Sequence, residues 1–155
     1  MRPVNTSTLI RSARPADVPA LCDLLADLFE IESDFTADFK KQANGLRLLI
    51  EDGLGRSKVY VAVHDGRVIG MCSVQMIIST SEGRRAAILE DLVVNREHRG
   101  FGFGTALLEA VGKWCLERGI SRLQLLADKE NSQALTFYAN RGWCSTNLVC
   151  LRKYL

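Results

Sequence analysis

The chain lacks several features that would assign it to other classes of protein. No apolar run approaches the roughly 18 residues of a membrane span, and the amino-terminal residues lack the apolar core of a secretion signal. The formal net charge is only +2, and lysine and arginine are scattered rather than gathered in a basic stripe. We therefore expect a cytoplasmic protein that binds neither a membrane nor a nucleic acid.

Patterns for metal binding and disulfide formation are also missing. The cysteines are odd in number and never spaced as Cys-x-x-Cys; they are Cys22, Cys72, Cys115, Cys144 and Cys150. Reduced thiols and no metal site are therefore expected. Cys115 shares a helical stripe with Leu107 and Val111, which favours a packing role. Of the two histidines, His64 falls in a tight turn and His98 precedes a glycine-rich loop, so neither is favoured as a catalytic group.

Two nucleotide-binding signatures are absent although glycines are concentrated at residues 100–104. The dinucleotide fingerprint Gly-x-Gly-x-x-Gly fails in both registers, because Thr105 and Leu107 stand where its third glycine belongs. The P-loop ending Gly-Lys-Ser/Thr is missing as well. What is present is Arg-Gly-Phe-Gly-Phe-Gly at residues 99–104, between a strand-like run at 88–94 and a helix-patterned stretch at 105–118.

A strand that leads through a glycine-rich loop into a helix has a physical reason to bind phosphate. The helix start offers backbone N–H groups and the positive end of the helix dipole. Three glycines in five residues cost conformational entropy, and a simple connection rarely needs more than one residue at positive φ. The pattern favours a loop that holds a phosphate-bearing ligand over a turn without one.

Hydrophobic periodicity predicts an α+β fold. Apolar spacing after Arg14-Pro-Ala-Asp17 indicates a first helix through Leu28, and further helices are expected at 36–51, 105–118 and 132–140. Strands are expected at 9–13, 58–64, 67–78, 86–94, 122–127, 143–146 and 149–155. Asp65-Gly66 predicts a type I′ hairpin turn. The order predicts a single domain with a mixed, mostly antiparallel sheet and a central parallel strand-helix-strand unit at residues 88–127.

Several motifs, in the expected order, resemble those of one family. The run Arg99-x-x-Gly102-x-Gly104 matches the Arg/Gln-x-x-Gly-x-Gly/Ala loop of the GNAT superfamily of acetyl-CoA-dependent N-acetyltransferases. Three more stretches resemble the opening, the fourth strand and a later motif of that family, namely Arg14-Pro-Ala-x-Asp, Leu89-Glu-Asp-Leu-Val-Val and Glu130-Asn-x-x-Ala-x-x-Phe-Tyr-x-x-x-Gly142. Among subfamilies, the chain looks most like the spermidine/spermine and thialysine acetyltransferases.

The resemblance implies one N-acetyltransferase domain over residues 1–155 with acetyl-CoA as co-substrate and no metal. By this resemblance the loop amides from Phe101 to Thr105 bind the pyrophosphate and the strand ending at Val94 pairs with the pantetheine arm. The implied cofactor-binding residues are Leu92, Val93, Val94, Arg99, Gly100, Phe101, Gly102, Phe103, Gly104, Thr105, Asn131 and Tyr138. Read from the residues alone, Arg99 can also be a solvated charge, and Asn131 can cap the helix that begins at Ser132.

An amine acceptor needs help to lose a proton, because an unperturbed amine like that of lysine has a pKa of about 10.4. Glu90 and Asp91 are the candidate carboxylates. Adjacent strand residues point to opposite faces unless a bulge intervenes, so only one of them is expected to face the acceptor. By the resemblance Glu90 is the base, acting through water. Solvated strand-end carboxylates are the alternative, although acids inside an apolar run more often mark functional sites.

Departure of the coenzyme A thiolate benefits from a proton donor, and Tyr138 is the candidate. A thiol has a reference pKa of about 8.5 and tyrosine about 10. The alternative is that Phe137 and Tyr138 only pack the last helix, but Asn131 in the matching motif favours the catalytic role. The predicted mechanism is direct transfer in a ternary complex without an acyl-enzyme.

The acceptor is expected to be a small cationic amine, such as a polyamine or a basic amino acid. Glu30, Glu32 and Asp34 lie between the first two helices, where the family forms its acceptor site, and with Glu90 they are the predicted substrate-binding residues. That the acidic residues of this connection are ordinary solvated charges at a helix end is an equal alternative. A protein lysine, an amino-terminal amine and a non-catalytic acetyl-CoA-binding module stay open. The resemblance also allows a homodimer, formed through a strand edge or the carboxyl-terminal strand.

Overall fold

The computed structural model describes residues 8–32 and 34–155. The amino-terminal stretch in which no secretion signal is expected lies largely outside the described residues. Contacts divide the chain into two compact units, Met1–Leu125 and Leu126–Leu155, and each is described by itself. No helix in the described ranges is long and apolar enough to cross a membrane.

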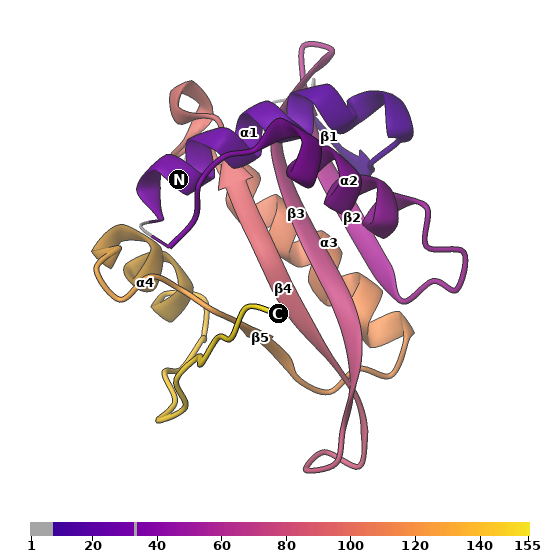
Figure 1. The fold of residues 1–155 in the computed structure, drawn as a ribbon, viewed down its shortest axis with the longest axis vertical. Helices are drawn as coiled ribbons and strands as arrows, with labels where there is room; N and C mark the ends of the chain where they lie inside the picture. Colours follow the sequence, from indigo (N-terminus) through magenta and orange to yellow (C-terminus); the bar gives the residue numbers. More distant parts are fainter. Residues whose placement is uncertain (1–7, 33) are drawn as a thin grey trace. The chain divides into compact units, whose positions relative to one another are not determined.

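The first unit is built on one five-stranded sheet (Figure 1). Its strands are β1 (Thr8–Ser12), β2 (Ser57–His64), β3 (Arg67–Ser79), β4 (Arg84–Val94) and β5 (Leu123–Leu125), and they lie side by side in that order. Neighbours from β1 to β4 are antiparallel, whereas β4 and β5 are parallel. The predicted mixed, mostly antiparallel sheet with one parallel strand-helix-strand unit is confirmed. In the described sheet, β5 is an edge strand and pairs only with β4.

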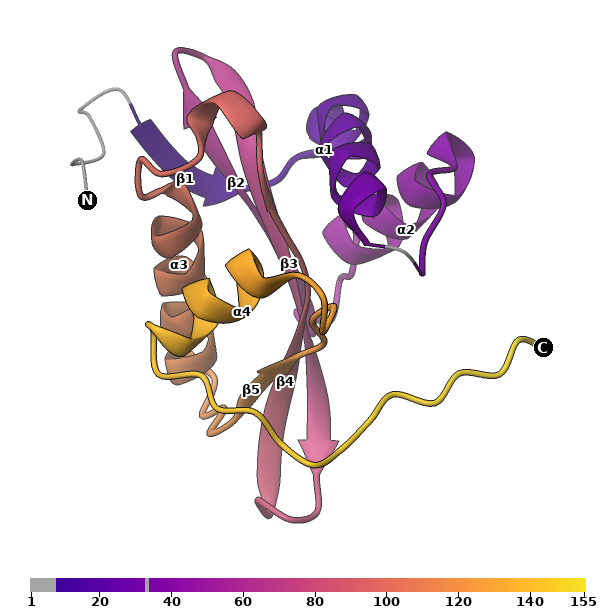
Figure 2. The ribbon, with the colours of Figure 1, turned by 90° about the vertical axis from the view of Figure 1, so that its left-hand side faces the viewer.

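Helices cover both faces of this sheet (Figure 2). The helices α1 (Val18–Ile31) and α2 (Phe39–Ile50) lie on one face, and α3 (Phe103–Glu117) lies on the other. Two buried apolar clusters follow from this layering. One joins α1 and α2 to Met71 and Val93 of the sheet, and the other joins α3 to Cys72 and Leu89. Two short 3₁₀ turns, η1 (Pro15–Asp17) and η2 (Arg96–His98), precede α1 and α3.

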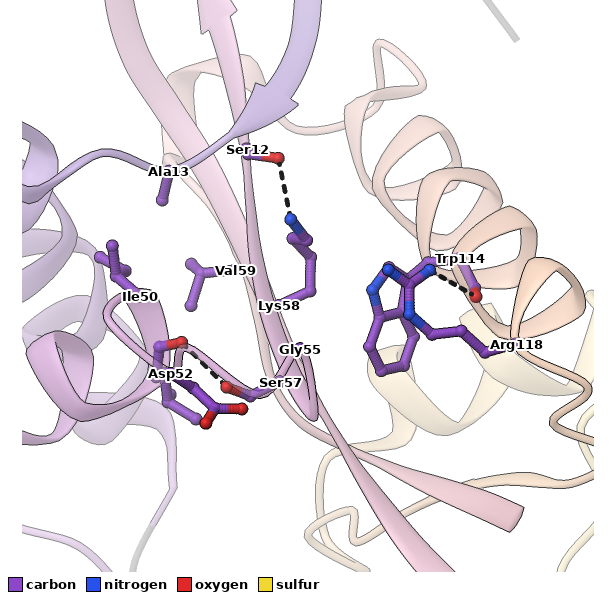
Figure 3. A pocket seen from close by; sticks show the side chains of 11 residues that line it. Ser12, Ala13, Ile50, Asp52, Gly55, Ser57, Lys58, Val59, Trp114 and Arg118 are labelled. Atoms are coloured by element: carbon purple, nitrogen blue, oxygen red, sulfur yellow. Dashed lines mark hydrogen bonds between the residues drawn. The ribbon is translucent and has the colours of Figure 1, made fainter. Parts of the chain in front are cut away.

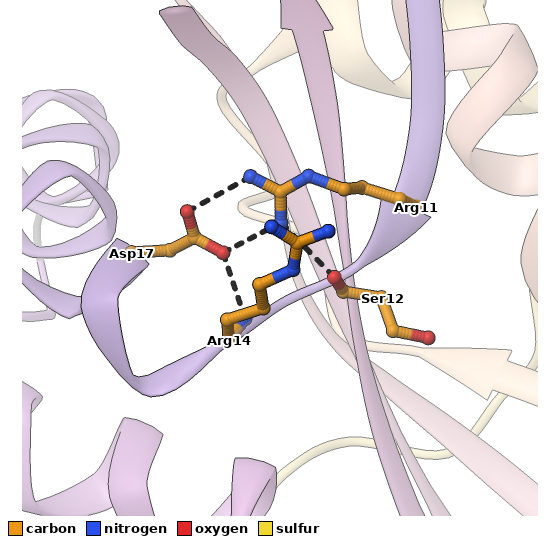
Figure 4. A network of polar contacts seen from close by, with 4 residues as sticks. All are labelled: Arg11, Ser12, Arg14 and Asp17. Carbon is orange, nitrogen blue, oxygen red and sulfur yellow. Dashed lines mark hydrogen bonds and ion pairs between the residues drawn. The ribbon is translucent and has the colours of Figure 1, made fainter.

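The chain enters α1 through a polar network that ties the helix to β1 (Figure 4). The Arg11 guanidinium donates hydrogen bonds of 2.7 and 3.0 Å to the two carboxylate oxygens of Asp17. The Arg14 backbone N–H donates to the same carboxylate at 2.7 Å. The hydrogen bond from Arg11 is the main reason that the pKa of Asp17 lies below its ordinary value. Asp17 is the residue before α1, as predicted, but its side chain caps η1 and not α1 itself.

The Asp65-Gly66 hairpin is found at its predicted place, and the helices predicted from residues 36 and 105 begin within three residues of those positions. Asp65 and Gly66 have φ values of 48° and 74°, as a type I′ hairpin requires. The helix expected at 105–118 begins two residues earlier, at Phe103. The helix expected from residue 36 begins at Phe39, where the Asp38 carboxylate accepts from the Lys41 N–H at 3.2 Å. Phe39 is therefore 58% exposed and does not face the core.

The second unit contains α4 (Ser132–Ala139), which ends before Gly142 at φ 83°. The predicted strands at 143–146 and 149–155 are wrong, because these described residues form no ladder with another strand. A strand needs a neighbour to pair with its N–H and C=O groups, and alternating apolar residues do not supply one. Leu148 and Leu151 are accordingly 86% and 90% exposed.

Candidate functional site

The glycine-rich loop joins the end of β4 to the start of α3. Gly100 and Gly102 have φ values of 79° and 91°, which L side chains rarely adopt, so two of the three glycines are required by the backbone. The first helical hydrogen bond of α3 runs from the Ala106 N–H to the Gly102 carbonyl, at 3.0 Å. The N–H groups of Phe103 and Gly104 precede it, at the positive end of the helix dipole. This geometry suits an anion such as a diphosphate.

Contacts on both sides of the loop hold it in place. The Arg99 Nε donates to the Val94 carbonyl at 2.9 Å, which ties the loop to the strand end. Phe103 is buried, and its ring lies 5.7 and 6.2 Å from the rings of His64 and His98. These two histidines thus pack under the loop. Sequence reasoning gave them no such role, because the contact joins residues from β2, η2 and α3.

A β-bulge in β4 changes the direction of the two candidate carboxylates. Ser73 of β3 pairs with Asp91, but the next residue, Val74, pairs with Leu89, so Glu90 is an extra residue in β4. Leu89 packs in the cluster with α3. Asp91 lies two residues before Val93, on the sheet face that packs against α1. The bulge lets Glu90 leave the strict alternation that places neighbours on opposite faces.

The edge of β4 that faces β5 loses its ladder partner at the same position. β5 pairs only with Ala87, Ile88 and Leu89, so the parallel ladder stops one residue before the bulge. From Leu92 to Val94, among the described residues of this unit, β4 has a ladder partner only in β3. Backbone N–H and C=O groups along such an edge can pair with an extended ligand that carries amides.

Asp91 is held in a mostly apolar environment. Its carboxylate accepts a hydrogen bond of 3.0 Å from the hydroxyl of Ser73, which is fully buried. Burial raises the pKa of Asp91 to about 6, the Ser73 hydrogen bond opposes that rise, and the charge of Glu90 adds to it. Glu90 itself is exposed. A carboxyl group with a pKa near the working pH is suited to proton transfer.

The acidic residues predicted for the acceptor lie at the end of α1 and after it. Glu30 is exposed in the last turn of α1, and Glu32 and Asp34 follow in the connection to α2. In the same region the rings of Phe29 and Phe35 are 5.3 Å apart. This connection belongs to the helices on the same sheet face as Asp91.

The two remaining predicted residues belong to the second unit. The Asn131 side-chain oxygen accepts from the Ala134 N–H at 3.1 Å, so Asn131 caps α4 as the sequence allowed. The Tyr138 ring lies 5.3 Å from Phe137 and 5.5 Å from Trp143, each edge to face. These ring contacts give Tyr138 a packing role in the second unit.

A hollow at the other end of β2 lies apart from this site (Figure 3). Trp114 of α3 and Arg118, the residue after α3, line it together with Lys58 of β2. The Lys58 ammonium donates to the Ser12 hydroxyl at 3.4 Å. Trp114 follows Gly102 by twelve residues, which corresponds to about 18 Å along a helix. None of the residues that line the hollow is among those predicted for the site.

Comparisons with known proteins cover most of the chain. The profile described as "Acetyltransferase (GNAT) family" matches residues 19–143. A thialysine N-epsilon-acetyltransferase of Sus scrofa is 29% identical over 147 residues, covering 88% of this chain and 84% of that protein. A mycothiol acetyltransferase of Nocardiopsis dassonvillei is 26% identical over 136 residues, covering 82% of this chain and 38% of that protein.

Solved structures share the fold at lower identity. A possible acetyltransferase from Clostridium difficile 630 superposes with a TM-score of 0.82 at 18% identity, covering 96% of this chain and 97% of that one. An aminoglycoside acetyltransferase from an uncultured soil metagenomic sample, in complex with sisomicin, gives a TM-score of 0.74 at 20% identity, covering 96% of each chain. At these identities the likeness concerns the fold alone.

Proposed function

Because the chain belongs to the acetyltransferase (GNAT) family and is an N-acetyltransferase, we propose that it moves the acetyl group of acetyl-CoA onto the primary amine of a small cationic acceptor. The observation that carries this proposal is the junction of β4 and α3. There a bulged pair of carboxylates, an open strand edge and a helix start behind a glycine loop follow one another within fifteen residues, from Glu90 to Gly104.

Members of this family use acetyl-CoA as co-substrate, and the residues of the junction fit it. The amides of Phe101 to Thr105 would hold the diphosphate at the start of α3. The edge of β4 from Leu92 to Val94 would pair with the amides of the pantetheine arm, leaving the thioester beside the bulge. Arg99 already bonds the Val94 carbonyl through Nε and would direct its remaining N–H groups to the phosphates. Asn131 and Tyr138 complete the proposed cofactor set.

The proposed reaction is a direct transfer. The amine nitrogen attacks the thioester carbonyl carbon, the carbon–sulfur bond breaks, and the sulfur leaves as the coenzyme A thiolate. Glu90 takes one proton from the acceptor ammonium through a water before the attack. As the carbon–sulfur bond breaks, the Tyr138 hydroxyl protonates the thiolate, and the second proton that the nitrogen loses restores the hydroxyl. Asp91 is the second candidate for the base, because its pKa of about 6 suits that task.

Cysteine chemistry gives this direct route further support. Burial raises the pKa of Cys22, Cys72 and Cys115, so these thiols stay protonated and are poor nucleophiles. Cys144 and Cys150 are exposed in the second unit. We expect each of the five cysteine-to-alanine variants to keep the chemical step, and an acetyl-cysteine trapped during turnover would refute direct transfer.

The acidic connection after α1 supports a cationic acceptor. Glu30, Glu32 and Asp34 would attract an amine that carries a second positive charge, as a polyamine or a basic amino acid does. The relatives named thialysine N-epsilon-acetyltransferase agree with such an acceptor. A protein lysine or amino-terminal amine is the alternative acceptor. Pairing as a homodimer, a cytoplasmic location and one N-acetyltransferase domain over residues 1–155 remain predictions, the last supported by the family match.

A thiol-release assay over a panel of amines, with calorimetry for acetyl-CoA, tests the proposal. We expect saturable binding and turnover that favours diamines and lysine-like amines. Glu90→Gln should lower kcat by about 10²-fold or more if Glu90 is the base, and Asp91→Asn should do so if the task falls to Asp91. Saturable binding without turnover of any amine would instead identify a non-catalytic acetyl-CoA-binding module, and no binding at all would refute the whole proposal.

A further inference from the structure

Ser73 stands out among the buried side chains of the described residues. Only two buried residues there are polar, Ser73 and Ser79, and both lie on β3. Ser79 has a role in the fold, because its hydroxyl accepts from the Glu82 N–H at 3.2 Å and contacts Ser81 at the turn into β4. Ser73 lies in the middle of the sheet, where a hydroxyl costs free energy unless it is hydrogen-bonded, and its partner is the Asp91 carboxylate at 3.0 Å.

The position of this pair coincides with the bulge. Ser73 is the last residue of β3 in register before the shift that leaves Glu90 extra. Ser73 and Asp91 each lie two residues from Met71 and Val93, so both share the sheet face that packs against α1. The Ser73 hydroxyl therefore reaches the carboxylate from directly across the ladder and fixes one of its two oxygens.

We propose that Ser73 is a positioning residue of the acetyl transfer, whose hydroxyl holds the Asp91 carboxylate ionised and oriented beside the bulge. This inference rests on the proposed function. The role of Ser73 is the same in two cases. Either Asp91 receives the proton, or Glu90 receives it while Asp91 attracts the ammonium, and both tasks need the Asp91 carboxylate as an anion. Ser73 acts only through Asp91 and touches no reacting atom.

The electrostatic surroundings of Asp91 leave Ser73 as its main local support. Burial disfavours the anion and raises the pKa of Asp91 to about 6, the Ser73 hydrogen bond lowers it, and Glu90 on the same strand raises it. From β3 the neighbouring ionisable group is Cys72, whose own pKa is raised to about 12, so its thiol is neutral. The charged side chains of the two helices on this face are exposed: Asp23, Asp27 and Glu30 on α1, and Lys40, Lys41 and Arg47 on α2. α3 and its charged side chains lie on the other face, and β5 carries no charged residue.

The direction of the effect follows from these causes. Without the Ser73 hydroxyl the anion loses a hydrogen bond, so the pKa of Asp91 rises above its value of about 6. A larger fraction of the enzyme is then protonated at Asp91 near pH 6, whereas at pH 8.5 nearly all of it remains ionised. The loss of activity is therefore confined to acidic pH, which a general disturbance of the fold would not produce.

The test compares Ser73→Ala with Ser79→Ala, a matched control that removes a buried hydroxyl from the same strand. The pH dependence of kcat/KM is measured from pH 5 to 9 with one amine, so that the ionisation of the acceptor cancels in the comparison. In Ser73→Ala we expect the acidic limb of the kcat/KM profile to move up by about one pH unit. The value of kcat/KM should then fall about fivefold at pH 6 and less than twofold at pH 8.5, relative to the native enzyme. Ser79→Ala should leave the limb in place, and Ser73→Thr, which keeps the hydroxyl, should restore it.

A second measurement needs no activity. Carbon-13 NMR of aspartate carboxyl groups follows the titration of Asp91 directly, with Asp91→Asn to assign the signal, and should show a higher midpoint in Ser73→Ala. An unshifted midpoint, or a loss equal at pH 6 and pH 8.5, overturns the inference. If the native protein turns over no amine, the proposed function fails, and an NMR shift then leaves Ser73 as a support of Asp91 without a catalytic role.

Discussion

Among single residues, Asp91 carries a carboxyl group that the protein interior disfavours as an anion. Its pKa of about 6 lies above the ordinary value of 3.8, so the native state binds a proton more tightly than the unfolded chain does. The contribution of Asp91 to the free energy of unfolding should therefore fall as pH rises from about 4 to about 6 and then stay level. The chain keeps this unfavourable group at the bulge, where the proposed chemistry needs it.

Replacing Asp91 by asparagine should stabilise the protein at neutral pH and impair it as an enzyme. Asparagine keeps an oxygen that accepts from the Ser73 hydroxyl but carries no charge to bury. We expect about 1–3 kcal/mol of added stability at pH 7.5, shrinking toward zero near pH 4. Denaturant unfolding at several pH values measures it. Glu90→Gln removes only the neighbouring charge that raises the pKa of Asp91 and should give a smaller gain. A stability gain of equal size at pH 4 would contradict the electrostatic explanation.

Gly100 allows a matched test of the glycine loop. Gly100 and Gly55 both have positive φ, 79° and 66°, and an added Cβ at either meets no atom within 4 Å. Valine should therefore strain the two positions alike, at a cost of about 1–3 kcal/mol. Only Gly100→Val should also weaken acetyl-CoA binding by tenfold or more, because it alone disturbs the loop. Calorimetry on both variants decides it, and equal affinities would show that the loop does not hold the cofactor.

At the scale of elements, the junction of β1 with α1 depends on one ion pair. Asp17 accepts two hydrogen bonds from Arg11 and one from the Arg14 N–H, and the pair is largely shielded, with side chains 21% and 11% exposed (Figure 4). The bond from Arg11 lowers the pKa of Asp17 below 3.8. The contribution of this ion pair to the free energy of unfolding is therefore fully present above about pH 4, and it is lost as pH falls through the lowered pKa of Asp17.

Asp17→Asn should accordingly destabilise the protein by about 1–2 kcal/mol at neutral pH. The difference in the free energy of unfolding between the variant and the native protein should shrink below pH 4, because protonation then removes the charge of the native Asp17 as well. Thermal unfolding followed by circular dichroism from pH 3 to 8 measures the two curves. A difference that stays constant through acidic pH would indicate lost packing and not a lost ion pair.

Elements specified by nearby residues were predictable from the sequence, whereas features set by pairing across the sheet were not. The Asp65-Gly66 hairpin and the loop before α3 follow from which residues accept positive φ. The bulge at Glu90 depends on the register of β3 against β4, so the sequence left the direction of the two carboxylates open. Ser73 went unnoticed for the same reason: no local signal marks a serine whose partner is eighteen residues away.

Two other errors have the same physical origin. The run from Val149 to Leu155 has the composition of a strand but no ladder partner among the described residues, and composition cannot supply one. The run from Trp143 to Thr146 was likewise predicted as a strand, and it too has no ladder partner among the described residues. In both cases the tertiary environment overrode the local preference.

For the whole molecule, the open question is whether its two compact units unfold as one domain. The chain has two tryptophans, and each belongs to a different unit: Trp114 is buried on α3 in the first, and Trp143 packs on Tyr138 in the second. Trp143→Phe leaves fluorescence that reports on Trp114 alone, and Trp114→Phe leaves fluorescence that reports on Trp143 alone. Circular dichroism supplies a third, global signal for each variant.

We expect one cooperative transition, so that in each variant the fluorescence and circular dichroism midpoints coincide. Acetyl-CoA at about a hundred times its dissociation constant should raise the free energy of unfolding by about 2.7 kcal/mol, because it binds the folded state only. If the chain is one domain, that increase must appear equally at both tryptophans, since neither unit can then unfold without the other. A Trp143 signal that melts earlier, or that ignores the cofactor while the Trp114 signal responds, would mean that residues 126–155 are an independent unit and that the predicted single domain is wrong.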